Sequence, residues 1–96
     1  MPRIDIRRDH GKTDIEEVKA SVRDLAQKLT QRFDLTCRWN GDNLEFKRKG
    51  AEGRIEVDAR KVRFVMDLSL LLTPIRGEIE KRTHRYMDEY FGPAKR

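Results

Sequence analysis

Apolar and polar residues alternate through the middle of the chain, Leu35–Leu72, in four short runs separated by turn residues. A period of two is typical of β-strands that bury one face. The dipeptide Asn40-Gly41 favours a type I′ hairpin turn after the first run, because both central residues of that turn need a positive φ. Gly50 and Gly53 are expected to be turn glycines around a longer second loop. The stretch therefore predicts a four-stranded antiparallel meander.

The alternation also assigns the apolar residues of the meander to an inner or an outer face. Cys37 and Trp39 are expected to be buried in the core, and the longest run is expected to bury every second residue as far as Leu70. Two apolar residues break the phase, since Val65 falls on the outer face and Leu71 follows at the end of the run. Exposed apolar residues often mark a surface for a partner.

The segments on either side of the meander predict one more strand and two helices. Residues 3–8 alternate like a strand, and apolar residues then recur every three or four positions, which predicts a helix over 14–33. Thr13 and Glu16 have the capping-box spacing at its start. Thr73-Pro74 predicts the start of the second helix, with Thr as N-cap and Pro at the first helical position, and Gly92-Pro93 predicts its end.

The predicted element order is βαββββα, a single α+β domain over 1–96 in which residues 93–96 form a frayed tail. We expect two layers, with a five-stranded antiparallel sheet and two helices packed on one of its faces. Strand one should lie antiparallel beside the last strand, which gives the spatial order 2-3-4-5-1. Parallel pairing of strand one with strand two is the rival topology.

Composition places the chain among globular proteins, with 36% hydrophobic and 41% charged residues. No run approaches the roughly 18 apolar residues of a membrane span, and no signal peptide is recognisable, so we expect a cytoplasmic protein. The net charge of +5 would suit nucleic acid or another polyanion. Most basic residues are interspersed with acids, however, and only Lys47-Arg48-Lys49 and Lys95-Arg96 cluster without one. A solvated, ion-paired surface is the simpler interpretation.

No spacing of His, Cys, Asp, Glu or Ser forms a catalytic or metal-binding constellation, so we expect no enzyme, no metal and no cofactor. His10 and His84 are assigned structural or surface roles. Asp5 and Asp67 are expected on the outer sheet face in a network with arginines rather than as an acid and base. A groove between the helices and the sheet could hold an acyl chain, although large inward side chains should fill it. The candidate interaction surface consists of Arg38, Lys47, Arg63, Val65 and Leu71.

The order of turn and strand residues resembles a known family. The resemblance is carried by three segments: Trp39-x-Gly41-Asp42-x-Leu44-x-Phe46, Gly50-x-x-Gly53-x-Ile55-x-Val57 and Leu71-Leu72-x-Pro74-Ile75-x-Gly77-x-Ile79. In these segments the chain is similar to the polyhydroxyalkanoic acid system proteins, a family of small bacterial proteins. The resemblance implies an association with the genes or the granule surface of polyhydroxyalkanoate storage, and it assigns no catalytic residue.

Three hypotheses of function follow from these observations. The first is a non-enzymatic accessory or granule-associated protein that acts by contact with the granule surface or with granule proteins. The second is a nucleic-acid-binding module that uses the basic faces. The third is a small acyl-ligand-binding domain. Self-association as a homo-oligomer stays open under all three.

Overall fold

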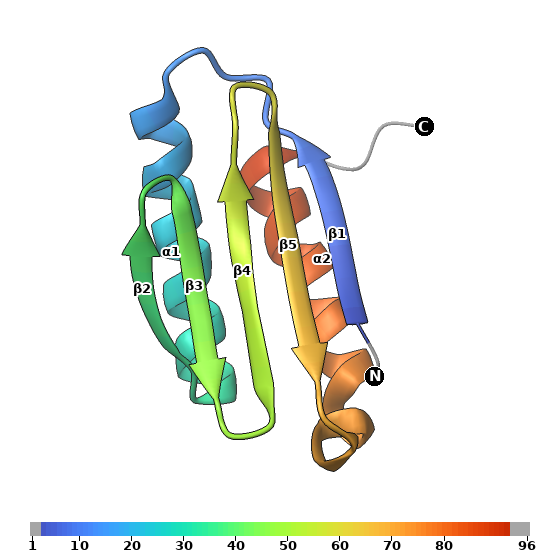
Figure 1. Ribbon diagram of the computed structural model, residues 1–96. Helices are drawn as coiled ribbons and strands as arrows, with labels where there is room; N and C mark the ends of the chain where they lie inside the picture. Colours follow the sequence, from blue (N-terminus) through green and yellow to red (C-terminus); the bar gives the residue numbers. More distant parts are fainter. Residues whose placement is uncertain (1–2, 93–96) are drawn as a thin grey trace.

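Five strands form one antiparallel sheet, and two helices cover one of its faces (Figure 1). The computed structural model describes residues 3–92, so the predicted tail at 93–96 lies outside the described residues. The strands are β1 Arg3–Asp9, β2 Thr36–Asn40, β3 Asn43–Arg48, β4 Ala51–Val57 and β5 Lys61–Leu68, and the helices are α1 Ile15–Phe33, the 3-10 helix η1 Leu70–Ile75 and α2 Arg76–Phe91. This confirms the predicted two-layer α+β fold.

The strand order across the sheet is β1-β5-β4-β3-β2. It confirms the first-choice topology, in which β1 pairs antiparallel with β5, and shows that the rival parallel pairing of the first two strands is wrong. α1 returns the chain across the inner face, so that β1 and β2 occupy opposite edges (Figure 1). The outer face of the sheet therefore carries no covering layer among residues 3–92.

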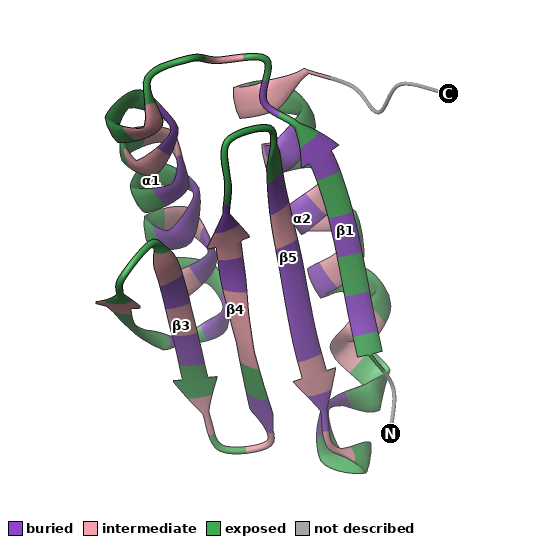
Figure 2. Cartoon of the chain, turned by 45° about the horizontal axis from the view of Figure 1, so that its top comes forward, coloured by how far each residue is buried: buried purple, intermediate pink, exposed green. Residues whose placement is uncertain are grey.

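The core lies between the inner face of the sheet and the apolar stripes of the two helices. Its residues form one continuous cluster, which appears as purple bands on the strands and on the inward sides of the helices (Figure 2). Phe46 and Phe64 meet at its centre with ring centroids 5.9 Å apart. α2 contributes one polar residue, Thr83, whose hydroxyl donates to the carbonyl of Ile79 and is thereby satisfied without water.

Several local predictions were wrong by one or two residues. The N-cap of α1 is Asp14 rather than Thr13, and its carboxylate accepts a hydrogen bond from the amide of Glu16. The first hairpin turn is centred on Gly41-Asp42, because Asn40 still pairs with Asn43 across the sheet. Only Gly41 has a positive φ there, as in a type II′ turn.

The second loop is shorter than predicted. Arg48 pairs with Ala51, so only Lys49 and Gly50 form the turn. Gly53 is not a turn residue but lies within β4, where an added Cβ would stand 2.3 Å from the carbonyl oxygen of Val65. A close approach of two strands therefore explains this glycine.

Cys37 is exposed, so the prediction that it is buried was wrong. It lies on the edge strand β2, where its sulfur accepts a weak hydrogen bond from Thr30 of α1 but no further element covers it. Trp39 on the same strand is half-buried and packs against the core, with the ammonium of Lys19 5.7 Å from its ring centroid. The edge position thus explains why alternation alone overestimated burial.

The end of β5 also differs from the prediction. The strand stops at Leu68, and the next residues turn into η1, so Leu70 leaves the sheet instead of continuing its inner face. Thr73 and Pro74 lie inside η1, and α2 begins only at Arg76 without a side-chain cap. Leu72 turns inward and is buried, which fixes the corner after β5, and its neighbours Leu70 and Leu71 stay exposed.

Candidate functional site

The outer face of the sheet carries a network of ion pairs rather than a reactive pair of acids. Arg3 donates to both carboxylate oxygens of Asp67 at 2.7 and 3.1 Å, and Arg63 donates to both oxygens of Asp5 at 3.0 and 2.7 Å. The hydrogen bonds from Arg63 lower the pKa of Asp5 to about 2, and those from Arg3 lower the pKa of Asp67. Both acids stay ionised near neutral pH, which confirms the predicted charge network.

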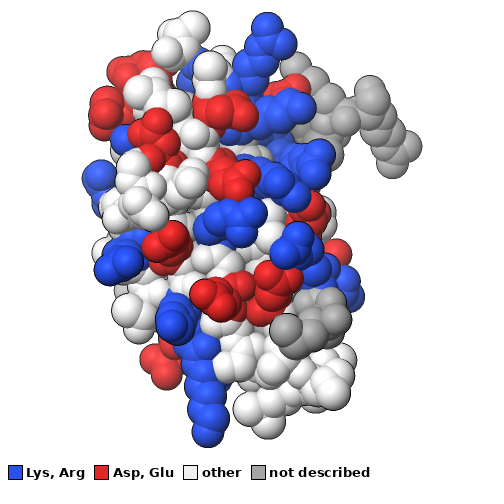
Figure 3. All heavy atoms as spheres, viewed as in Figure 1, with Lys and Arg blue, Asp and Glu red and all other residues white. Residues whose placement is uncertain are grey.

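Opposite charges mingle over the whole of this face (Figure 3). Where β4 crosses it, Arg54 contacts Glu56, and Glu56 also lies 3.8 Å from Arg63. Because most of these cations already have carboxylate partners, the face offers little unbalanced positive charge to a polyanion.

Val65 points toward this outer face but is fully buried, so the prediction that it forms part of an exposed apolar patch was wrong. Its neighbours across the sheet are Asp5 on β1 and Arg54 on β4. Long arginine side chains commonly lay their methylene groups over apolar surface while their charged ends stay in water. The ion-paired side chains around Val65 therefore form its cover.

The structure does not bring the five predicted surface residues together. Arg38 is exposed on β2, with its Nε 3.8 Å from Glu45. Arg63 is held by Asp5 at the other side of the sheet, and Val65 is buried beside it. Lys47 lies near the end of β3, and Leu71 lies on η1. Only Lys47 and Leu71 approach the same end of the molecule.

At that end, η1 exposes two adjacent leucines that we call the leucine tip: Leu70, which is 81% exposed, and Leu71, which is 68% exposed. They are the exposed large hydrophobic residues of the described chain. Figure 3 shows the uncharged surface in this region at the lower right. Sequence reasoning found Leu71 but missed Leu70, although three consecutive leucines before Thr73-Pro74 signal that alternation has ended.

The leucine tip adjoins the turn between β3 and β4. The amide of Ser69 donates to the carbonyl of Gly50 at 2.8 Å, which ties the start of η1 to that turn. A surface hollow of about 230 Å³ lies between them, lined by Lys47, Arg48, Gly50, Ala51, Glu52, Asp67 and Ser69. The tip is therefore held beside the basic residues Lys47 and Arg48 rather than isolated on a long loop.

The two histidines take part in contacts between elements. The Nε2 of His10 donates to the carbonyl of Asp58 at 2.9 Å, while its Nδ1 accepts from the amide of Lys12. His84 on α2 accepts at Nδ1 from the buried Arg8, whose guanidinium also binds Asp88 at 3.0 Å. These bonds join the first loop to the β4–β5 turn and join β1 to α2, which agrees with structural roles.

The inner face weighs against an acyl-binding groove. Phe46, Phe64 and Met66 are 1% exposed or less, so large side chains fill the interface beneath the sheet. A surface hollow of about 410 Å³ lies beside His10 and Lys12, with Asp9, Arg60 and Lys61 also in its lining. Within the same residues, no group of three His, Cys, Asp or Glu side chains is placed to hold a metal ion. No helix there is long and apolar enough to cross a membrane.

The class of protein that fold and surface define is a small two-layer α+β domain with an ion-paired sheet face and an exposed leucine tip. The chain belongs to the family described as "Putative polyhydroxyalkanoic acid system protein", whose model matches residues 4–91. The match spans every helix and all but the first residue of the strands, and it confirms the resemblance seen in the turn and strand residues. No curated protein and no solved structure matches the chain.

Proposed function

We propose that this protein is a non-enzymatic accessory protein of polyhydroxyalkanoate storage, which acts in the cytoplasm by binding the surface of polymer granules or the proteins on it. Its membership of the polyhydroxyalkanoic acid system family supports the setting. The observation that carries the mode of action is the leucine tip, because two adjacent leucines exposed at 81% and 68% are costly in water unless a partner covers them.

The titratable groups support a role without catalysis. Two pairs with double hydrogen bonds, Arg3 with Asp67 and Arg63 with Asp5, join strands across the sheet. Arg8 binds Asp88 between β1 and α2 in the same way. Carboxylates held by arginines in this way are poor general bases, since the hydrogen bonds favour their ionised form and lower their basicity.

Localisation in living cells tests the proposal. A fluorescent fusion of the full chain should form foci that coincide with stained granules when polymer is stored, and it should be diffuse when no polymer is stored. The fluorescent protein alone is the control. A fusion that stays diffuse in cells full of granules would overturn the proposal.

The nucleic-acid alternative has weaker support from the structure. The sheet face is ion-paired, and Lys28 and Arg32 on α1 bind Glu89 and Glu78 of α2. Titration of duplex and single-stranded DNA at two salt concentrations tests it, because phosphate contacts make affinity fall steeply with salt. We expect at most weak binding, and tight salt-sensitive binding would favour this alternative instead.

A further inference from the structure

We propose that the leucine tip and the neighbouring segment Lys47-Arg48-Lys49, which spans the end of β3 and the first residue of the β3–β4 turn and is called the basic turn below, form one docking surface for a layer of anionic amphiphiles such as anionic phospholipids. The inference deepens the proposed function and rests on it for the place where such a layer is met in the cell. In this proposal the apolar leucines and the cationic lysines at one end of the domain contact the same layer at the same time.

The two parts lie at the same end of the molecule. In Figure 1, β3 and β5 both run toward the bottom, where β3 ends in the basic turn and η1 follows β5. The hydrogen bond from the amide of Ser69, just before the tip, to the carbonyl of Gly50, just after the basic turn, links their neighbouring residues. Gly50 has a φ of 88°, and an added Cβ would lie 2.9 Å from the Ser69 hydroxyl and 3.2 Å from Leu72. This close packing fixes the position of the tip relative to the basic turn.

The leucines are presented from a rigid base. Leu72 is 8% exposed and packs into the core beneath them, and Pro74 restricts the backbone of the same 3-10 helix. Leu70 and Leu71 therefore project from a backbone that is already held in place. Insertion into an apolar layer would remove both from water and requires little rearrangement of the protein.

The charge beside the tip is positive and available. Lys47 and Lys49 are exposed, and neither takes part in an ion pair within residues 3–92. Arg48 donates to the carbonyl of Phe33 at 2.6 Å, which binds the turn to the end of α1. The nearby acids are Glu52, opposite Lys47 in the sheet, and Asp34 after α1.

Other acids toward this end already have cationic partners. Asp67 is held by Arg3, and the pairs Arg32–Glu78 and Arg76–Glu80 lie on the helices. Lys47 and Lys49 thus have no carboxylate partner among residues 3–92 and are free to meet an external anion.

Anionic amphiphiles match this arrangement best. Their headgroups carry negative charge at the surface, and their acyl chains offer an apolar layer directly beneath, so lysines and leucines are engaged together. Nucleic acid would use the lysines and leave the leucines in water. A second copy of this chain would cover the leucines but would bring two basic turns close together, which like-charge repulsion opposes.

Flotation of the full-length protein with lipid vesicles tests the inference. We expect binding to phosphatidylcholine vesicles that contain phosphatidylglycerol, much weaker binding to phosphatidylcholine alone, and a decrease with added salt. Replacement of both tip leucines (Leu70→Ser, Leu71→Ser), or of both lysines (Lys47→Gln, Lys49→Gln), should each weaken binding about tenfold or more.

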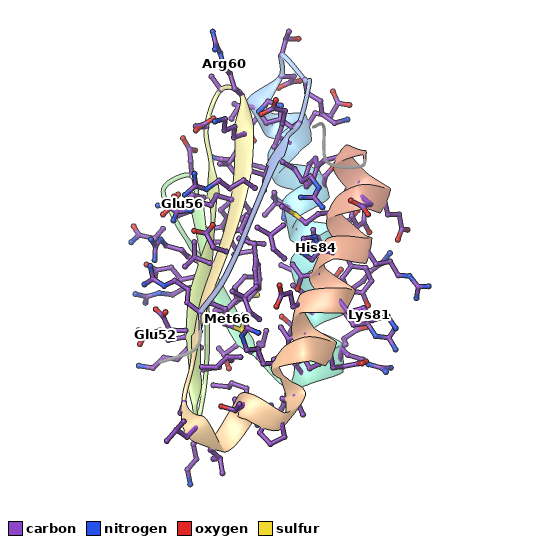
Figure 4. The ribbon with its side chains drawn as sticks, turned by 90° about the vertical axis from the view of Figure 1, so that its right-hand side faces the viewer. Glu52, Glu56, Arg60, Met66, Lys81 and His84 are labelled. Atoms are coloured by element: carbon purple, nitrogen blue, oxygen red, sulfur yellow. The ribbon has the colours of Figure 1, made fainter. Side chains whose placement is uncertain are left out.

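A matched control removes the same charge at the opposite end of the domain. Arg60 is exposed in the β4–β5 turn and Lys61 is exposed at the start of β5, and Figure 4 labels Arg60 at the end away from η1. The variant Arg60→Gln, Lys61→Gln should bind like the wild type, and circular dichroism should show that all variants are folded. Equal losses at both ends would show unspecific charge attraction and overturn the inference, as would full binding by the leucine variant or no binding by the wild type.

Two further results keep this inference separate from the proposed function. Granule foci without vesicle binding would overturn the docking surface and leave the proposed function standing. Vesicle binding by the protein, together with a fusion that stays diffuse in cells, would overturn the proposed function and leave the docking surface standing. Sedimentation equilibrium addresses the second copy: a dimer that the leucine variant converts to a monomer would show that another chain covers the tip and would overturn the inference.

Discussion

Val65 on the outer sheet face and Leu71 on the leucine tip both break the alternation of the meander, yet Val65 is fully buried and Leu71 is 68% exposed. Val65 has strands on both sides, and their charged side chains cover it. Leu71 follows the last strand, where no neighbouring strand can cover it. An apolar residue on the outer face of a sheet is therefore poor evidence of a partner surface, whereas one beyond the end of the sheet is better evidence.

The largest expected difference in stability is between alanine variants of two glycines, one in β4 and one at the start of α2. In Gly53→Ala the new Cβ would lie 2.3 Å from the carbonyl oxygen of Val65, so β4 and β5 must separate locally. Gly77 in α2 has nothing within 4 Å of such a Cβ. Urea unfolding should show a loss of about 3 kcal/mol for Gly53→Ala and a gain of about 0.5 to 1 kcal/mol for Gly77→Ala. Equal effects would contradict the difference in packing.

A smaller contrast compares the two phase-breaking residues directly. Val65→Ala removes buried methyl groups and should lower the free energy of unfolding by about 1 to 2 kcal/mol. Leu71→Ala removes a side chain that is already mostly in water and should change it by less than about 0.5 kcal/mol. Urea unfolding of both variants measures this difference. A loss for Leu71→Ala as large as that for Val65→Ala would show that the tip is part of the fold rather than a free surface.

The sequence was sufficient to predict the sheet order, because period-two runs separated by short turns leave few ways to connect four strands. The position of β1 followed from the long first helix, which returns the chain across the sheet. The family was also within reach, since the resemblance rested on residues such as Gly41, Gly53 and Pro74 and the family model matches residues 4–91. The residues that predicted the strands and turns thus include the residues that carried the family resemblance.

Features that depend on three-dimensional neighbours were beyond the sequence. Gly53 looks like a turn glycine until the approach of β5 is known. Cys37 has the phase of a core residue, but its strand lies at an edge. The run Leu70-Leu71-Leu72 permits either an inward Leu70 or an inward Leu72, and only the corner after β5 decides between them. The candidate site was therefore predicted in part, with Lys47 and Leu71 near it and Leu70 missed.

The smallest expected effect tests whether the ion pairs of the sheet face do more than cover Val65. Because Arg63 lowers the pKa of Asp5 to about 2 from an ordinary 3.8, the ionised form is favoured in the folded state. This stabilisation is present above about pH 4 and is lost as the pH falls toward 2. Exposure of the pair limits it to about 1 kcal/mol or less.

Urea unfolding of the wild type and of Asp5→Asn should therefore differ at neutral pH, and the difference should shrink as Asp5 is protonated. Asp24→Asn, which removes an exposed carboxylate of α1 without an ion pair among residues 3–92, controls for the general loss of one negative charge. Added salt should reduce the effect at Asp5 by screening. If the difference between wild type and Asp5→Asn stayed constant from neutral pH down to about pH 2, the carboxylate would contribute packing over Val65 rather than charge.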